Sequence, residues 1–301
     1  MFSTYRAERW ESFVDRSVTV RYFQLTAIGE AEVPFEDAIE QANRLGNRPS
    51  DRAKRIPHGA VIRLERKRMN AGLLTGEVVR EQRENIPPEA TDDALVPLGV
   101  RGLGHSVAFV YDSVSRVIAI QFDPRGVSLG RFLDYLTAVN RNARYRFEAV
   151  VSDDAWARYN RGDPRSITFK IASPENLDVA AGGGSALSIS KRLAEISDGA
   201  SITVQISMGT VQQRNLRRDF VDSTIRLLTG DGAADRVKSL KVKSKPEGQP
   251  TDEIDFVKDF ARDHDELELP SDNHAENYRR RAAFVMRSFK ARIDEIRDGY
   301  A

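Results

Sequence analysis

Apolar residues recur along this chain with two different spacings, one typical of strands and one typical of helices. Runs rich in β-branched and aromatic residues predict strands over residues 18–25, 144–151 and 166–173. Two further pairs of such runs are joined by short turn segments at 70–72 and 112–115, so each pair predicts a hairpin.

Two segments between these strands have the pattern of helices. Residues 34–46 begin with proline, carry acids in the first turn and end at Gly46. Residues 128–140 repeat apolar side chains at helical spacing, namely Leu129, Phe132, Leu133, Leu136 and Val139. Because hairpins rather than long crossover connections join the strands, the order of elements favours the α+β class with antiparallel sheets.

The second half of the chain begins with a glycine-rich stretch. Residues 180–197 are typical of a linker that leads into a helix. After it we expect, in this order, a strand at 201–208, a helix at 212–228, a lysine-rich strand, an acidic segment reaching residue 277, and a long C-terminal helix over roughly 275–297. The chain is therefore expected to form two α+β domains, residues 1–177 and residues 178–301.

Composition narrows the class of protein. Hydrophobic residues make up 40% of the 301 residues and charged residues 30%, which is typical of a globular chain with a substantial core. The chain contains no cysteine, which excludes disulfides, thiolate chemistry and cysteine zinc sites. The charged first residues contain no apolar signal core, and no apolar run is long enough to span a bilayer. We therefore expect a cytoplasmic protein that does not insert into a membrane.

Charge is segregated along the chain, although the formal net charge is only +1. Residues 44–68 hold nine basic and two acidic side chains, and residues 279–292 hold six basic and no acidic ones. Between them, residues 247–278 hold eleven acidic and two basic side chains. Basic blocks of this kind can converge on one surface that binds nucleic acid, or they can be solvated faces of alternating sign.

The lysine-rich strand is the most specific of these basic segments. Lys241, Lys243 and Lys245 recur at every second residue, so their ammonium groups share one face of a strand. They could guard an edge strand against unwanted pairing, or they could follow a phosphate backbone. On the preceding predicted helix, Arg214, Arg217 and Arg218 are three and four residues apart and would share one helical face.

These patterns predict a surface that contacts the backbone of double-stranded DNA rather than its bases, because no aromatic stacking platform and no zinc-finger spacing accompany them. The primary candidates are Arg214, Arg217, Arg218, Lys238, Lys241, Lys243 and Lys245. The secondary candidates are Arg66, Lys67, Arg68, Arg279, Arg280 and Arg281. The acidic residues 247–278 directly follow the lysine strand, so we expect them to compete with DNA as an internal brake.

Catalytic chemistry has a weaker basis in the sequence. Glu65 and Lys67 form a Glu-x-Lys pattern on a predicted strand, with Asp51 upstream, as in Mg²⁺-dependent nucleases of the restriction type. The pattern is short, and Asp51 falls in a polar loop. No set of nucleophile, base and orienting group can be assembled, so we predict no catalytic residue, metal ligand or cofactor. A nuclease remains the alternative, and a protein-binding module whose apolar C-terminal helix docks a partner or a second copy is a further one.

Residues 104–177 carry a resemblance to a known family. A hairpin with a Gly-x-x-x-Phe/Ala opening is followed by a short helix containing Phe-Leu and by strands that flank a short polar segment. This order resembles the Rex exclusion protein A family of lambdoid phages. The C-terminal part is similar in plan, with a strand, a basic helix, two strands and a final helix.

The resemblance implies a homodimeric α+β protein that binds duplex DNA with little sequence preference. It also implies a role in phage exclusion or anti-phage defence, where a cytosolic sensor works with a membrane effector partner. The basic block Arg236–Lys245 departs from the family and does not align residue by residue. The candidate residues named above therefore rest on the charge pattern alone.

Overall fold

The computed structural model describes residues 13–172, 201–209, 215–229 and 237–300. The fold is of the α+β class, with mainly antiparallel sheets and a C-terminal helix. Contacts between Cα atoms divide the chain into two units. The first unit comprises Met1–Val20, Gly29–Arg144 and Arg262–Ala301, and the second comprises Arg21–Ile28 and Tyr145–Ala261.

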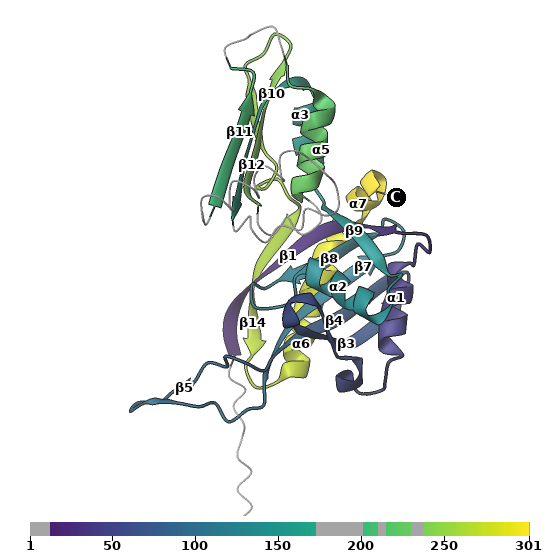
Figure 1. Ribbon diagram of the computed structural model, residues 1–301, viewed down its shortest axis with the longest axis vertical. Coiled ribbons are helices and arrows are strands. Elements are labelled where there is room, and N and C mark those ends of the chain that lie inside the picture. Colours follow the sequence, from purple (N-terminus) through teal and green to yellow (C-terminus); the bar gives the residue numbers. More distant parts are fainter. Residues whose placement is uncertain (1–12, 173–200, 210–214, 230–236, 301) are drawn as a thin grey trace, which may run out of the picture. The chain divides into compact units, whose positions relative to one another are not determined.

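A large sheet forms the centre of the first unit (Figure 1). Its strand order is β14-β1-β8-β7-β4-β3-β2, and β1 belongs to this unit up to Val20. The strands are β1 (Phe13–Ile28), β2 (Lys54–Arg55), β3 (Val61–Asn70), β4 (Leu73–Gln82), β7 (Leu103–Asp112), β8 (Val117–Phe122) and β14 (Arg262–Pro270). The hairpins β3–β4 and β7–β8 and the pairing of β4 with β7 are antiparallel.

Helices cover both faces of this sheet. The aromatic rings of Phe35, Phe109 and Phe132 pack against one another, which fixes α1 (Phe35–Asn43) and α2 (Leu129–Val139) on one face. The other face carries α6 (His274–Ala291), which packs on β4, β7, β8 and β14. The remaining elements of the unit are α7 (Ile293–Tyr300), the 3-10 turns η1 (Pro49–Arg52) and η2 (Pro57–Gly59), and the short hairpin of β5 (Glu89–Ala90) and β6 (Leu95–Val96).

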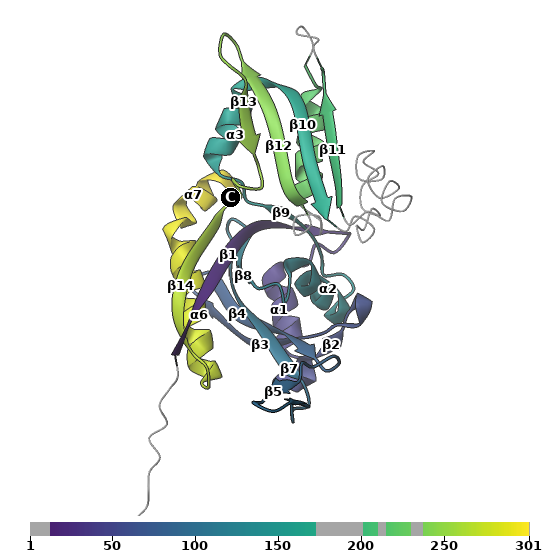
Figure 2. The same cartoon turned by 90° about the vertical axis from the view of Figure 1, so that its left-hand side faces the viewer.

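The second unit contains a smaller, four-stranded antiparallel sheet with the strand order β11-β10-β12-β13 (Figure 2). Two helices lie on one face of this sheet, α3 and α5 (Figure 1). The segment of β1 after Val20 also belongs to this unit and pairs with β9. The elements are β9 (Arg144–Ala149), α3 (Asp153–Asn160), β10 (Gly162–Ala172), β11 (Ser201–Ser207), α5 (Arg218–Thr229), β12 (Val237–Pro246) and β13 (Asp252–Asp255).

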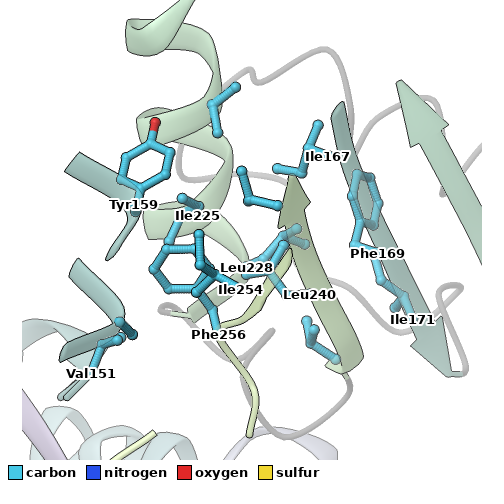
Figure 3. Close-up of a cluster of buried hydrophobic side chains, with 14 residues drawn as sticks. Val151, Tyr159, Ile167, Phe169, Ile171, Ile225, Leu228, Leu240, Ile254 and Phe256 are labelled. Atoms are coloured by element: carbon cyan, nitrogen blue, oxygen red, sulfur yellow. The ribbon is translucent and has the colours of Figure 1, made fainter. Parts of the chain in front are cut away.

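The core of the second unit fills the space between these helices and the sheet (Figure 3). Every second residue of β10 contributes to it, namely Ile167, Phe169 and Ile171, and all three are fully buried. Leu240 and Val242 of β12 face the same way, and Ile225 and Leu228 of α5 meet them. One face of the sheet is therefore apolar and covered, and the alternate residues of each strand project from the opposite, open face.

The structure corrects several expectations for individual elements. The polar segment around Trp156 is helix α3, whose N-cap Ser152 accepts a hydrogen bond from the backbone N–H of Ala155. The acidic segment, for which no element was predicted, contains the strands β13 and β14. The C-terminal helix is interrupted at Arg292. Its apolar side chains Phe284, Val285 and Phe289 are buried against the unit's own sheet, so they do not form an open seam for a second copy.

The two units also differ from the expected division between residues 177 and 178. That boundary lies outside the residues that the structure describes, as does the glycine-rich linker at 180–197. β10 pairs with β11 and β12, which come later in the chain, whereas β14 and α6 pack in the first unit. The division is therefore set by strand pairing between distant segments, which local composition does not reveal.

Candidate nucleic-acid interface

The predicted lysine row is present on β12. Lys241 is half-buried and Lys243 and Lys245 are exposed, while Leu240, Val242 and Ser244, which alternate with them, are buried. This alternation places the three ammonium groups on the open face of the four-stranded sheet. Lys238 is exposed where a β-bulge shifts the register between β10 and β12.

The position of β12 within the sheet excludes one explanation of the lysines. β12 pairs with β10 on one side and with β13 on the other. It is an interior strand, so its lysines do not guard an edge.

Neighbouring strands complete a polar surface around the row, which we term the open lysine face. Thr168 and Lys170 of β10 project from this face, because Thr168 lies directly opposite Lys241. Gln205 and Thr203 of β11 lie opposite Thr168 and Lys170 in turn. The open lysine face therefore combines hydroxyl, amide and ammonium groups, namely Thr168, Lys170, Thr203, Gln205, Lys241, Lys243 and Lys245. It also carries the carboxylates of Asp163, Glu253 and Asp255, which lie opposite Lys245, Lys243 and Lys241.

A single carboxylate on β13 restrains two of these lysines. Glu253 Oε1 accepts a hydrogen bond from Lys241 Nζ at 2.7 Å, and Glu253 Oε2 lies 3.8 Å from Lys243 Nζ. The hydrogen bond from Lys241 lowers the pKa of Glu253, and the same bond raises the pKa of Lys241. Both groups are thus charged at neutral pH, and β13 places a second carboxylate, Asp255, directly opposite Lys241.

The expected arginine stripe is not formed on α5. The helix begins at Arg218, so Arg217 lies before it, and Arg214 lies outside the described residues. Arg218 stacks over the ring of Tyr159 and donates a hydrogen bond to the carbonyl oxygen of Gly162. Arg217 is exposed and pairs with Asp219 at 2.6 Å. Since α5 covers the apolar face of the sheet, these arginines do not join the lysine row on the open face.

Two of the secondary candidates, Arg66 and Arg281, belong to a buried polar cluster of the first unit. Glu77 on β4 is fully buried, and Arg281 on α6 is 5% exposed. Arg281 Nη2 donates to Glu77 Oε1 at 3.2 Å, Arg66 Nε lies 2.9 Å from Glu77 Oε2, and His274 Nε2 lies 3.3 Å from Glu77 Oε1. The guanidinium of Arg281 also donates to Ser106, Gln121 and Asn277.

Arg281 is therefore wrong as a phosphate contact, because its hydrogen-bonding groups are buried and already used. The periodicity of α6 contains a signal for this outcome. Arg281 lies three, four, seven and eight residues before the buried Phe284, Val285, Ser288 and Phe289, so it is on the apolar face of its helix. A charged residue at such a position needs a buried partner, and Glu77, placed inside the apolar strand β4, provides it.

The charge state of Glu77 follows from its partners. Burial alone raises the pKa of a carboxyl group, but hydrogen bonds from His274 and Ser106 and the charge of Arg281 outweigh it, and the pKa of Glu77 lies below its ordinary value. Burial is also the largest influence on Arg281, and it lowers the pKa of the guanidinium. The cluster is a charged pair held inside the first unit.

The other secondary candidates have carboxylate partners or lie at the surface. Arg66 also stacks over the ring of Tyr278, with its Cζ 4.5 Å from the ring centroid. Lys67 forms an ion pair with Glu40, and Arg68 is exposed. Arg279 and Arg280 both pair with Glu276, whose pKa falls to about 2 because of these two hydrogen bonds.

Comparison with models of protein families shows the family to which this chain belongs. The model of a family of unknown function, DUF6731, matches residues 16–287. The chain belongs to the DUF6731 family. A comparison with curated proteins gives no match. The matched range includes both the open lysine face and the Glu77 cluster, so both are features of this DUF6731 chain within the segment that defines the family.

The residues of the alternative nuclease pattern are occupied by ion pairs in this DUF6731 protein. Glu65 pairs with Arg63 at 2.9 Å, and Asp51 pairs with Arg48 at 3.4 Å. Within the described residues, no three His, Asp or Glu side chains are grouped so that they could hold a metal ion. In the same part of the chain, no helix is long and apolar enough to cross a membrane.

Proposed function

We propose that this DUF6731 protein is a non-catalytic protein that binds the phosphate backbone of double-stranded DNA through its open lysine face. The observation that carries the proposal is the row of Lys241, Lys243 and Lys245 on one face of an interior strand. Alternate residues of a strand are about 6.7 Å apart, so the row presents three evenly spaced positive charges. Such a row of ammonium groups can contact the phosphates that carry the negative charge of a DNA strand.

The remainder of the open lysine face supports backbone binding rather than base recognition. Thr168, Thr203 and Gln205 offer hydroxyl and amide groups that hydrogen-bond to phosphate oxygens. Among the described residues, the open lysine face presents no aromatic ring that could stack on an unpaired base, since Phe169, the aromatic side chain of β10, faces the core. We therefore expect duplexes of different sequence to bind with similar affinity.

The wider biological role stays a prediction from the resemblance to Rex exclusion proteins. That resemblance leads us to expect a homodimer that acts in the cytoplasm, in phage exclusion, together with a membrane effector partner. The candidate contacts are now restricted to the lysines of the open face, with Lys238 beside them.

The experiment that tests this function measures affinity for a short fluorescent duplex by anisotropy between 50 and 200 mM salt. Binding that neutralises phosphates should weaken with salt, with a slope of log affinity against log salt of about −0.9 per phosphate. Replacing Lys241, Lys243 and Lys245 with Gln should remove about three such contacts and make the slope shallower by about 2.7. The loss should be the same for duplexes of unrelated sequence.

A matched control separates the open face from overall charge. The variant Arg83→Gln, Arg287→Gln and Lys290→Gln removes the same three charges from exposed positions of the first unit. This control should keep most of the wild-type affinity and slope. Equal losses in both variants, or no binding by the wild type, would refute the proposed site.

A further inference from the structure

The strand β11, Ser201–Ser207, is one edge of the four-stranded sheet. Within the described part of the chain it pairs with β10 on one side and ends the strand order on the other (Figure 2). An edge strand presents backbone donors and acceptors that can pair with another strand. Its sequence, Ser-Ile-Thr-Val-Gln-Ile-Ser, shows which partner fits.

The backbone groups on the outer side of β11 can be assigned from its register. Met208 N donates to Arg165 O, which continues the constant register between β11 and β10. Because hydrogen-bonded pairs alternate along an antiparallel ladder, Ile202, Val204 and Ile206 also direct their backbone groups toward β10. The N–H and C=O groups of Ser201, Thr203, Gln205 and Ser207 therefore point outward from the sheet.

The two edges of this sheet differ in their protection. The opposite edge, β13, has the sequence Asp-Glu-Ile-Asp, so a second copy of the same strand would meet it with like charges. β11 has no charged residue, no proline and no glycine, and three of its seven residues are β-branched aliphatics. Charged side chains that prevent strand pairing are thus present on β13, whereas the strand β11 has none.

The sequence of β11 is also nearly symmetric about Val204. In an antiparallel pairing of two copies centred there, Ser201 meets Ser207, Ile202 meets Ile206, and Thr203 meets Gln205. Each contact joins chemically similar side chains, as the self-complementary interface of a two-fold dimer requires. The outward backbone groups fall on the Ser201–Ser207 and Thr203–Gln205 pairs, which gives about eight hydrogen bonds across the axis.

We propose that two copies of this chain pair through β11, antiparallel and centred on Val204, so that their four-stranded sheets join into one. The partly exposed side chains of Val204 and Ile206, which pack against the core of the unit, would meet their counterparts from the second copy. The uncharged Thr203 and Gln205 would lie between the two lysine rows. The proposal does not depend on DNA binding, and its tests are made without DNA.

A single engineered cysteine tests the pairing directly, because the chain has no cysteine of its own. In the proposed register, Val204 of one copy lies directly opposite Val204 of the other. The two residues form a non-hydrogen-bonded pair, with Cα atoms about 4.5 Å apart. This separation lies within the range that a disulfide spans. Mild oxidation of Val204→Cys should give a reducible covalent dimer, whereas the control Glu253→Cys on β13 should stay largely uncrosslinked. A V204C protein that crosslinks no faster than E253C would overturn the proposal.

A proline substitution tests the same interface without any crosslink. The N–H of Gln205 points outward, so Gln205→Pro leaves the ladder with β10 intact and removes donors from the dimer. Sedimentation velocity should give twice the 33.8 kDa of one chain for the wild type and the single-chain mass for Q205P. Circular dichroism should confirm that the variant is folded. A monomeric wild type, including one whose edge instead captures a foreign peptide, would refute self-pairing, and so would a folded Q205P that remains dimeric.

Discussion

The Glu77 cluster of the first unit and the open lysine face of the second contain similar residues in opposite settings. Arg281 and Glu77 are buried between α6 and its sheet, and each has several partners. Lys241 and Lys243 lie on an uncovered sheet face and share the partly exposed Glu253. A buried charge is tolerated in the fold only when an oppositely charged side chain is paired with it. A positive charge on an open face, in contrast, remains available to an external anion.

The largest expected effect comes from breaking the buried pair. Arg281→Met keeps most of the side-chain volume but leaves Glu77 buried without its charged partner, and the free energy of unfolding should fall by about 3–5 kcal/mol. Urea denaturation measures this change. The control Arg279→Met, at an exposed ion pair on the same helix, should leave the free energy of unfolding nearly unchanged.

A second substitution shows whether the cost comes from the uncompensated charge. Adding Glu77→Gln to Arg281→Met removes that charge, so the double variant should be more stable than R281M alone. If the double variant is no more stable than R281M, the loss of stability in R281M comes from altered packing and not from the unpaired charge of Glu77.

The acid stability of the protein should depend on Glu77. Its pKa in the folded chain lies below the ordinary value of 4.5, so the ionised carboxylate stabilises the fold above about pH 4.5, and this contribution is lost as the pH falls through the lowered pKa. Glu77→Gln should reduce stability at pH 7 by about 1.5–3 kcal/mol, because a hydrogen bond to a charged group is replaced. It should also flatten the fall in melting temperature between pH 5 and pH 3. If the melting temperature of E77Q falls between pH 5 and pH 3 as steeply as that of the wild type, other carboxyl groups cause the loss of stability in acid.

On the open face, removal of Glu253 should strengthen the proposed DNA binding. Glu253→Gln releases Lys241 and Lys243 from their shared carboxylate, and exposed ion pairs of this kind are weak. Affinity for a duplex should therefore rise roughly two- to ten-fold. Glu295→Gln removes one charge from an exposed position of α7 and should have little effect. Equal affinity of E253Q and wild type would mean that Glu253 is no brake on the lysine row.

The smallest expected effect is on stability at the open face. The triple Gln variant of Lys241, Lys243 and Lys245 should leave the midpoint of urea denaturation nearly unchanged, since its ion pairs are solvated. A clear fall in that midpoint would show that the lysines stabilise the fold, as the Glu77 cluster does, rather than bind a ligand.

Much of the local structure could be predicted from the pattern of residues. The β3–β4 and β7–β8 hairpins and helix α2 lie where alternation, turn residues and helical spacing place them. The helix α3 and the strand β14 were missed. α3 is short, and the alternating acids of β14 are typical of an exposed loop. In both cases contacts with distant segments outweigh weak local preference.

The candidate site was predicted in part. The common face of Lys241, Lys243 and Lys245 follows from a local period of two, and the structure has it. The interior position of β12, the separation of Arg218 from the lysines and the carboxylate of Glu253 beside them depend on strand order, which the local pattern does not encode.

By itself, the sequence determined which side chains share a face of each strand or helix, because that depends only on the repeat of the backbone. The tertiary structure decided which of those faces is covered. Arg281 is on the apolar face of α6 and became half of a buried pair, while the lysines of β12 are on the face that none of the described helices covers. The physical reason is that burial depends on pairing and packing between residues far apart in the chain, and burial decides whether a charge holds the fold together or meets a partner.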